Sequence, residues 1–394
     1  MKKIAVGQAG GPTAVINATL AGVVEQLQDR ECEIYFVEDG YEGLVNKRFF
    51  KGDDVLTNWI LNNRHTPGAC LTSGRYHLQD EGIQKAVTNL QQQGIQTLLF
   101  IGGNGTMEAL HKIKKEALRR DIDLQVIGLP KTVDNDLGGT DHAPGFASAA
   151  NYIAQTIKDM SRDLHSMKNF EQVRVLETMG RNSGWLAAAS GAFKEYSEEG
   201  PHFIAIPERP LDENLLLSSV EQAIEEYGYA VVVVSEGVTF KESSQSLVNK
   251  VDGRIMLGGI SKTISEFLSS TLNLTTRAEL LGMNQRASSG YVSKTDAKEA
   301  YEIGKKGADF VHEGYDNVMV SIRRDPTRYY TIEMSEVSLQ TVIADGERLM
   351  PPHFINDLEA YNKWLIPLLG GEFPSYPPVL KGELKTSEYK SQYQ

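Results

Sequence analysis

Residues Thr97–Thr106, TLLFIGGNGT, lead from an apolar segment through a glycine-rich turn toward a helix. The segment Thr97–Ile101 is a continuous apolar run after its first residue, which is typical of a strand buried on both faces. Apolar residues at helical spacing then predict a helix from about Met107 through Arg119. A strand, a glycine turn and a helix in this order form the repeating unit of a parallel sheet that is covered by helices.

The same unit occurs before and after this stretch. Near the N-terminus, Lys3–Val6 predicts a short strand, Gly10–Pro12 a turn, and Thr13–Gln28 an amphipathic helix. Further buried strands are predicted at Glu33–Val37, Gln125–Gly128, Gln172–Leu176, Phe203–Ile206 and Ala230–Val234. We therefore predict an α/β fold with two doubly wound lobes that divide near residue 148.

Composition and charge exclude several classes of protein. With 394 residues, of which 41% are hydrophobic and 23% charged, the chain has the composition of an ordinary soluble globular protein. The 40 basic and 52 acidic residues leave a net charge of −12, whereas a nucleic-acid binder normally gathers a basic surplus. There are only two cysteines, Cys32 and Cys70, and no apolar run long enough to cross a bilayer or to act as a secretion signal. We expect a cytoplasmic protein that binds neither nucleic acid nor membrane.

Two glycine turns follow predicted strands, at Gly7–Pro12 and at Gly102–Thr106. In open α/β sheets ligands bind beyond the carboxyl ends of the strands, where both turns are expected to lie. Because glycine has no Cβ, the backbone N–H groups of such turns can approach a phosphate closely. Neither turn matches a dinucleotide fingerprint or a P-loop, so each taken alone could also be a simple strand-to-helix turn.

A third strand-end segment, Pro130–Asp136, has the sequence PKTVDND. Its two carboxylates, Asp134 and Asp136, can divide the work between accepting a hydroxyl proton and holding Mg²⁺. Lys131 and Thr132 supply donors for a phosphoryl group in transfer. An isolated Asp-Asn-Asp is usually a solvated turn, but its position as the third turn at one sheet edge favours a phosphoryl-transfer site.

Eight motifs in order make the chain similar to the phosphofructokinase family, over about residues 4 to 325. They are Gly10-Gly11 with Asn17, Asp39–Leu44, Ser73–Arg75, Gly102–Thr106, Pro130–Asp136, Met179–Arg181, Ser235–Gly237, and Gly282 with Gln285-Arg286. The resemblance implies two Rossmann-like lobes with mainly parallel sheets and the active site in the cleft between them. It assigns residues 1–148 plus about 285–340 to a larger phosphoryl-donor lobe, and about 149–284 plus 341–394 to a smaller sugar-phosphate lobe.

The resemblance also implies a role for each matching residue. Asp134 is expected to take the proton from the sugar 1-hydroxyl, with Thr132 and Lys131 beside the transferred phosphoryl group. The residues expected around the donor phosphates are Gly11, Arg75, Gly103, Asn104, Gly105 and Thr106, and those expected to hold the sugar phosphate are Met179, Gly180, Arg181, Glu236, Arg277 and Arg286. Arg181 also matches an arginine at the transferred phosphate, and Arg277 matches one that reaches the sugar 6-phosphate. The expected ligands of Mg²⁺ are Asp134, Asp136 and Asn104.

Departures from the family pattern leave the phosphoryl donor open between ATP and diphosphate. ATP users commonly have an aspartate where this chain has Asn104, and diphosphate users have a bulky acid at the position of Gly105, which blocks the nucleotide. Gly105 leaves that space open and favours ATP. Lys131, Gly10–Thr13 and Arg181–Trp185 instead resemble the diphosphate-using branch.

The acceptor pocket departs from the pattern as well. Gln172 stands where many relatives have an arginine or lysine that reaches across from a neighbouring subunit, and Met283 stands where they have histidine or tyrosine. Each loss removes a charge-assisted hydrogen bond worth about 1.5–3 kcal/mol and leaves Arg277 as the clear cation for a 6-phosphate. Either Arg174, on the same strand face as Gln172, compensates, or the acceptor differs from fructose 6-phosphate.

These inferences point to an Mg²⁺-dependent 6-phosphofructokinase that makes fructose 1,6-bisphosphate in glycolysis, with ATP as the favoured donor. The alternatives are a diphosphate-dependent phosphotransferase and an enzyme with the same chemistry on a nucleoside or a different sugar. A non-catalytic regulatory subunit is disfavoured because both aspartates are present. The resemblance further implies a homodimer or homotetramer.

Overall fold

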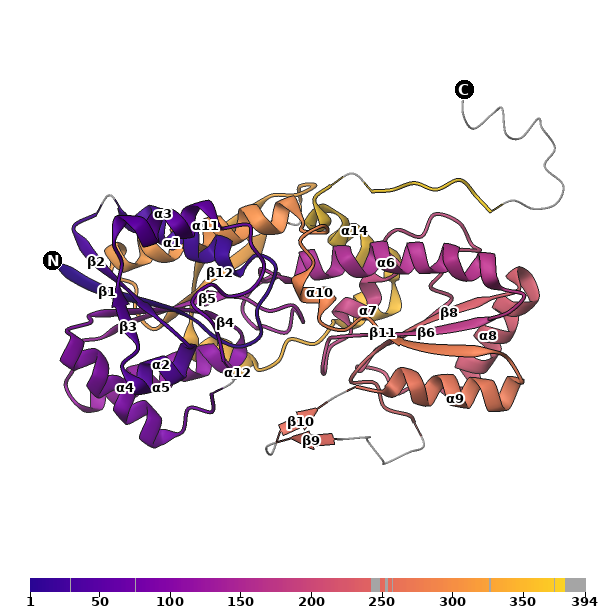
Figure 1. The fold of residues 1–394 in the computed structure, drawn as a ribbon, viewed down its shortest axis with the longest axis horizontal. Coiled ribbons are helices and arrows are strands. Elements are labelled where there is room, and N and C mark those ends of the chain that lie inside the picture. Colours follow the sequence, from indigo (N-terminus) through magenta and orange to yellow (C-terminus); the bar gives the residue numbers. More distant parts are fainter. Residues whose placement is uncertain are drawn as a thin grey trace, which may run out of the picture.

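The computed structural model describes residues 1–379 except for 29, 75, 242–248, 252–253, 257, 326 and 372. Of the predicted site residues, Arg75 lies outside the described residues, as does the part of the predicted smaller lobe beyond Val379. Two mainly parallel sheets, each packed against helices on both faces, lie side by side (Figure 1). The predicted α/β fold is confirmed.

The larger sheet has seven strands, of which the five central ones run parallel. Its order is β13 (Ile332–Ser338), β12 (Val318–Arg324), β5 (Gln125–Pro130), β4 (Thr97–Gly102), β1 (Lys2–Gln8), β2 (Cys32–Val37) and β3 (Phe49–Lys51). The edge strands β13 and β3 run antiparallel to their neighbours, and no sequence pattern above predicts them. β4 lies at the centre and is buried along its whole length, as its continuous apolar run indicates.

Helices cover both faces of this sheet (Figure 1). One face packs against α1 (Ile16–Gln28), α3 (Asp54–Asn62) and α11 (Lys294–Glu313), and the other against α2 (Gly40–Asn46), α4 (Asp80–Gln93), α5 (Asn104–Arg119) and α12 (Leu339–Asp345). α1 and α11 come into backbone contact, because a Cβ on Gly22 would lie 2.0 Å from the carbonyl oxygen of Tyr301. α5 begins at Asn104, before the predicted start near Met107, because the glycine turn winds directly into the helix after Gly103.

The smaller sheet has four parallel strands, in the order β11 (Thr276–Leu280), β6 (Val173–Thr178), β8 (Ala230–Ser235) and β7 (Phe203–Ala205). One face packs against α6 (Phe146–Met167), α7 (Trp185–Ala189), α13 (Pro352–Asn356) and α14 (Leu358–Leu369), and the other against α8 (Glu213–Tyr227) and α9 (Ile260–Leu272). The remaining elements are the hairpin strands β9 (Asn249–Val251) and β10 (Arg254–Met256) and the short helix α10 (Asn284–Ala287).

The predicted boundary near residue 148 falls in the first turn of α6, and the lobe boundaries remain a prediction. Among the helices that the structure describes, none is both long and apolar enough to span a membrane.

Candidate active site

The three predicted turns follow β1, β4 and β5, which are neighbours in the larger sheet, so they lie at one edge of it. Two side chains join the turns. Lys131 Nζ donates a hydrogen bond to the carbonyl oxygen of Gly11 at 2.7 Å, and Asn104 Nδ2 donates one to the carbonyl oxygen of Asp136 at 2.9 Å. The acidic segment Pro130–Asp136 therefore contacts both glycine turns.

The first glycine turn has two further neighbours. Ser73 Oγ donates a hydrogen bond to the carbonyl oxygen of Gly10 at 2.9 Å, which brings the loop that leads to Arg75 beside this turn. Arg75 itself lies outside the described residues, so its role at the donor phosphates remains a prediction. Arg286 covers the turn closely, since a Cβ on Gly11 would lie 2.8 Å from Arg286 Nη1. A side chain at position 11 would therefore require the guanidinium of Arg286 to shift.

Hydrogen bonds within the acidic segment orient its carboxylates. Thr132 Oγ1 donates to Asp136 Oδ1 at 2.9 Å and accepts from the backbone N–H of Asp134 at 3.2 Å. Between the two aspartates, Asn135 has a φ of 54°, a left-handed conformation that asparagine adopts more readily than most residues. Thr132 therefore fixes both the turn and the direction of one carboxylate.

Loops of the smaller lobe also contact the acidic segment. Met179–Arg181 follows β6, and Glu236 follows the neighbouring strand β8. The backbone N–H of Arg181 donates to Glu236 Oε1 at 3.2 Å, and Ser183 Oγ donates to the carbonyl oxygen of Asp134 at 3.0 Å. The carboxyl ends of both sheets thus meet at Asp134.

Helix α10 bridges the two lobes. Gln285 Oε1 accepts a hydrogen bond from the backbone N–H of Met179 at 3.0 Å, while Arg286 lies against Gly11. Gln285 is not among the predicted site residues, although it belongs to the motif that contains Arg286. Its amide is buried and positions Met179 through the backbone.

The surroundings of the acidic segment shift the pKa values of its two carboxyl groups. Burial, followed by the charges of Asp136 and Glu236, raises the pKa of Asp134 to about 7, against the opposing charges of Arg181 and Lys131. Burial also raises the pKa of Asp136. A carboxylate with a pKa near 7 is partly ionised at neutral pH and holds a transferred proton well, which is what a general base requires.

The donor set of the acidic segment fits Mg²⁺, which prefers oxygen ligands and usually keeps several waters and phosphate oxygens. The mutual repulsion of Asp134 and Asp136 is the kind of strain that a bound cation relieves. Asn104 turns its amide nitrogen to the backbone of Asp136, so only its amide oxygen could ligate a metal. Among the described residues, no group of three or more His, Cys, Asp or Glu side chains forms a metal site by itself.

The second glycine turn presents the N-terminus of α5. Gly103 caps this helix without a side-chain hydrogen bond, so the first backbone N–H groups of α5 remain suited to an anion. Gly105 is exposed, and a Cβ there would meet no atom within 4 Å. Thr106 is buried beneath the turn, since a Cβ on Gly102 would lie 2.0 Å from Thr106 Oγ1. Thr106 supports the turn, and its side chain is not brought to the site.

Arg277 is not brought to Asp134 of its own chain. In β11 it pairs in register with Arg174, near the amino end of β6, whereas Met179–Arg181 follows the carboxyl end of that strand. Arg277 forms an ion pair with Glu171 at 3.2 Å, and its side chain is 56% exposed. The arginine is therefore oriented toward the outside of this chain.

The two departures from the family pattern lie at opposite ends of the smaller sheet. Gln172, just before β6, accepts a hydrogen bond from the backbone N–H that precedes β11. Arg174 is buried and forms ion pairs with Asp163 at 2.8 Å and Glu171 at 3.0 Å, so its charge is already compensated and does not replace a lost cation. Met283, at the start of α10, is 59% exposed.

One segment that no motif predicts reaches the site. Between α12 and α13, the backbone N–H of Arg348 donates to the carbonyl oxygen of Asp136 at 2.7 Å, and Asn182 Nδ2 donates to Glu347 Oε2 at 2.6 Å. The guanidinium of Arg348 lies 4.4 Å from the ring centre of Trp185. Nothing in the local sequence indicates these contacts, because they join residues far apart in the chain.

Two mainly parallel sheets that bring glycine turns and a pair of carboxylates to one place define a phosphotransferase of the α/β class. Residues 3–311 match the family model described as phosphofructokinase, and the chain belongs to that family. It is 46% identical over 363 residues to the sulfofructose kinase of Alkalicoccus urumqiensis, with 92% of this chain and 94% of that one covered.

Other relatives carry diphosphate in their names. The chain is 33% identical over 392 residues to the pyrophosphate–fructose 6-phosphate 1-phosphotransferase of Methylococcus capsulatus, with 95% of this chain and 93% of that one covered. A solved structure, the pyrophosphate-dependent phosphofructokinase from Nitrosospira multiformis, matches with a TM-score of 0.84 at 30% identity, covering 98% of this chain and 95% of that one. The chain is accordingly an enzyme that transfers a phosphoryl group to a sugar hydroxyl.

Proposed function

We propose that the enzyme transfers the terminal phosphoryl group of ATP to the 1-hydroxyl of a fructose that carries a sulfonate in place of the 6-phosphate. The general reaction is that of the family, and the choice of acceptor rests on the cations that the acceptor pocket lacks. The proposal therefore departs from the fructose 6-phosphate that the family resemblance alone implies.

The charges of the acceptor pocket favour a sulfonate over a phosphate. A phosphate monoester carries about −1.5 to −2 charges at pH 7, and a sulfonate carries one. Gln172 and Met283 are uncharged where many relatives have basic or hydrogen-bonding side chains, and Arg174 is already paired with two carboxylates. A pocket with fewer cations suits the less charged anion, and the relative from Alkalicoccus urumqiensis is named a sulfofructose kinase.

Gly105 favours ATP as the phosphoryl donor. The open space at this position and the free N-terminus of α5 leave room for a nucleotide whose phosphates lie over the glycine turn. Diphosphate is the second candidate, favoured by Lys131, whose ammonium group is held beside the first glycine turn by the carbonyl oxygen of Gly11. Two of the relatives reported above carry pyrophosphate in their names.

The chain's own residues would then act as follows. Asp134 takes the proton from the acceptor hydroxyl as that oxygen attacks the phosphorus, and the bond to the leaving phosphate oxygen breaks. Lys131, Arg181 and the N–H groups at the start of α5 compensate the charge of the phosphoryl group in transfer. Asp136, oriented by Thr132, would hold Mg²⁺ together with Asp134, and the ion would screen the donor phosphates when bound.

We further propose that the sugar site is completed by a neighbouring subunit in a homodimer or homotetramer. The supporting observation is the position of Arg277, which lies at the amino end of β11, away from Met179–Arg181 of the same chain. A site that needs a cation at the sugar's anionic end would receive it from a second copy.

The test is a matrix of donors and acceptors. ATP and diphosphate are each combined with sulfofructose, fructose 6-phosphate, unphosphorylated fructose and a nucleoside, and kcat/KM is measured for every pair. We expect the highest value for ATP with sulfofructose. A higher kcat/KM with fructose 6-phosphate would contradict the acceptor assignment, and a higher value with diphosphate would contradict the donor assignment.

A further inference from the structure

The acidic segment rests on a second turn, residues 140–145, which we call the support turn. The backbone N–H of Thr132 donates to the carbonyl oxygen of Pro144 at 3.2 Å, and that of Ala143 donates to Asn135 Oδ1 at 3.2 Å. Asn135 is buried, so this bond is shielded from water. Because of these two hydrogen bonds, a movement of the support turn would also move Thr132 and Asn135, which lie on either side of Asp134.

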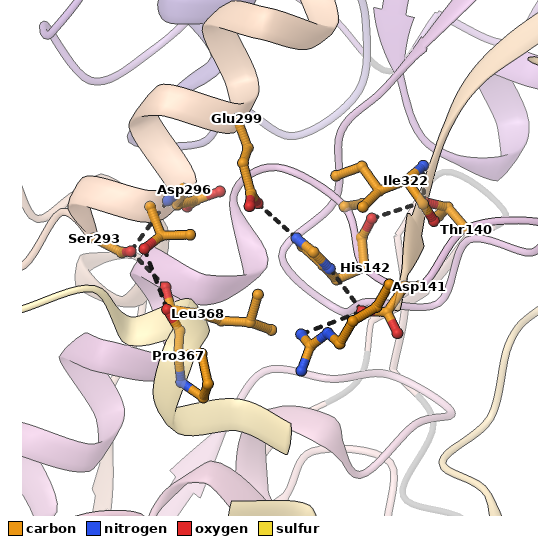
Figure 2. Close-up of polar contacts among 12 residues, drawn as sticks. Thr140, Asp141, His142, Ser293, Asp296, Glu299, Ile322, Pro367 and Leu368 are labelled. Carbon is orange, nitrogen blue, oxygen red and sulfur yellow. Dashed lines mark hydrogen bonds and ion pairs between the residues drawn. The ribbon is translucent and has the colours of Figure 1, made fainter. Parts of the chain in front are cut away.

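His142 lies at the centre of the support turn and is fully enclosed (Figure 2). Its Nδ1 is 2.8 Å from Asp141 Oδ2 and its Nε2 is 2.7 Å from Glu299 Oε2, a residue of α11. Ionised carboxylates only accept hydrogen bonds, so both ring nitrogens must carry protons and the ring is an imidazolium. Burial lowers the pKa of His142, but the hydrogen bonds and charges of Asp141 and Glu299 outweigh it and raise the pKa to about 9.

Other groups also contact the two carboxylates. Arg324 Nη2 lies 3.3 Å from Asp141 Oδ2, and the ring N–H of Trp364 donates to Asp141 Oδ1 at 3.2 Å. On the other side, the hydroxyl of Tyr330 donates to Glu299 Oε1. Arg324 belongs to β12 of the larger sheet and Trp364 to α14, which packs on the smaller sheet, so the cluster joins the support turn to both lobes.

Helix α11 contacts the support turn at a second point, through Asp296, which lies about one helical turn before Glu299. Asp296 accepts hydrogen bonds from the backbone N–H groups of Gly145 at 2.9 Å and Ser148 at 3.0 Å, which fixes the start of α6. Two further charges face the cluster, since Asp296 interacts electrostatically with Glu299 and Arg348 interacts electrostatically with Asp141.

We propose that His142 is a positioning residue for phosphoryl transfer: by bridging Asp141 and Glu299 it fixes the support turn on α11 and so holds Asp134 in place for the acceptor hydroxyl. The inference rests on the proposed role of Asp134. Misplacing a reacting group by about 1 Å can lower a rate by about 10²-fold. A small displacement of the support turn should therefore lower kcat measurably.

The test compares His142→Gln with a matched control, Tyr229→Phe. Glutamine is of similar length but cannot donate to both carboxylates, and the control removes a different buried hydrogen bond, from the Tyr229 hydroxyl to the carbonyl oxygen of Glu198 at 2.5 Å. We expect His142→Gln to lower kcat by about 10- to 100-fold with each KM within about threefold, and Tyr229→Phe to leave kcat within about twofold.

Hydrogen–deuterium exchange supplies a readout that does not need activity. Amides of residues 131–136 should exchange faster in His142→Gln than in wild type and should be unchanged in Tyr229→Phe. Wild-type exchange at this segment in His142→Gln, or equal loss of kcat in both variants, would overturn the inference. If the wild-type enzyme is inactive with every donor and acceptor, the proposed function fails, and exchange still decides the role of His142.

A second measurement covers the case in which His142→Gln does not fold. Wild-type kcat should fall as the pH rises through about 9, where the imidazolium loses its proton and one ring nitrogen faces a carboxylate without a hydrogen. A glutamine at position 299 can accept from this nitrogen when it carries a proton and donate an amide N–H to it when it does not, so Glu299→Gln should retain kcat within about threefold. A wild-type kcat that is constant between about pH 8 and about pH 10 would overturn the inference.

Discussion

The hydroxyl of Ser183, in the smaller lobe, donates a hydrogen bond to the main-chain carbonyl oxygen of Asp134 at 3.0 Å. The backbone of Asp134 is therefore held by the smaller lobe as well as by its own. On the other side, the N–H of Asp134 is bound by Thr132 Oγ1. With the main chain fixed from both directions, the carboxylate is positioned by the fold, and its chemistry can be tested by changing the side chain alone.

Replacing Asp134 by asparagine should remove the general base with little change of shape. We expect kcat to fall by about 10²–10⁴-fold, the usual contribution of such a group, while KM for the donor changes little. Steady-state kinetics check this, with the exposed carboxylate variant Asp123→Asn as a control that retains wild-type kcat. Near-normal turnover in a folded Asp134→Asn protein would rule out the assignment.

The same residue predicts how activity and stability respond to pH. Because the pKa of Asp134 is raised from 3.8 to about 7, the folded protein binds a proton that the unfolded chain has lost between these values, and its stability declines as the pH rises through that range. Activity should follow the opposite course and rise through about pH 7 as the base ionises. Asp134→Asn should therefore have a higher Tm than wild type at pH 8, measured by calorimetry, and an unchanged or lower Tm would contradict the shift.

The variant Gly105→Asp tests whether ATP is the phosphoryl donor. The position is open, so the added side chain should not disturb folding, and a carboxylate in the first turn of α5 favours the helix. Its charge would face the donor, and we expect kcat/KM for ATP to fall by about 10²-fold while any activity with diphosphate is spared. Gly105→Ala is the control and should retain ATP use within about threefold; equal ATP kinetics in both variants would remove the argument for the donor.

Met283→His tests the acceptor. The new side chain restores a hydrogen-bond donor, and we expect kcat/KM for fructose 6-phosphate to rise by about tenfold relative to sulfofructose, as one charge-assisted bond implies. Met283→Gln is the matched variant with a neutral amide and should give a smaller change. If kcat/KM changes by the same factor for both acceptors, residue 283 does not distinguish the phosphate from the sulfonate.

Mixing two inactive variants tests the shared site. Arg277→Ala and Asp134→Asn should each be nearly inactive alone, because one lacks the sugar cation and the other the base. After co-refolding in equal amounts, random pairing in a dimer leaves about a quarter of the sites intact, and activity should return to about that level. Activity that stays at the level of the separate variants would show that Arg277 serves its own chain or none.

The sequence predicted what depends on local chemistry. The apolar run at Thr97–Ile101 and the glycines after it produce a strand, a turn and a helix wherever they stand, and β4 and α5 follow that pattern. The contact of Asn104 with Asp136 also follows from strand order, since neighbouring parallel strands end at the same edge. These are properties of short segments plus one topological rule.

What the sequence could not provide depends on long-range register. The position of Arg277 opposite Arg174 is set by how β11 aligns with β6, and a shift along the strand would leave the local pattern unchanged. The contact of Arg348 with Asp136 joins a late loop to the site through a backbone N–H, for which no side-chain type is diagnostic. The burial of Thr106 results from how tightly the turn closes over it.

The exposure of Met283 has a consequence for how such enzymes diverge. Because 59% of its surface is open to water, exchanging it disturbs little packing and should change the folding free energy by no more than about 0.5 kcal/mol. A lineage could thus change from one sugar nutrient to another by single replacements at exposed positions such as 283, through ancestors that all remained folded. The chemistry around Asp134 would be inherited without change.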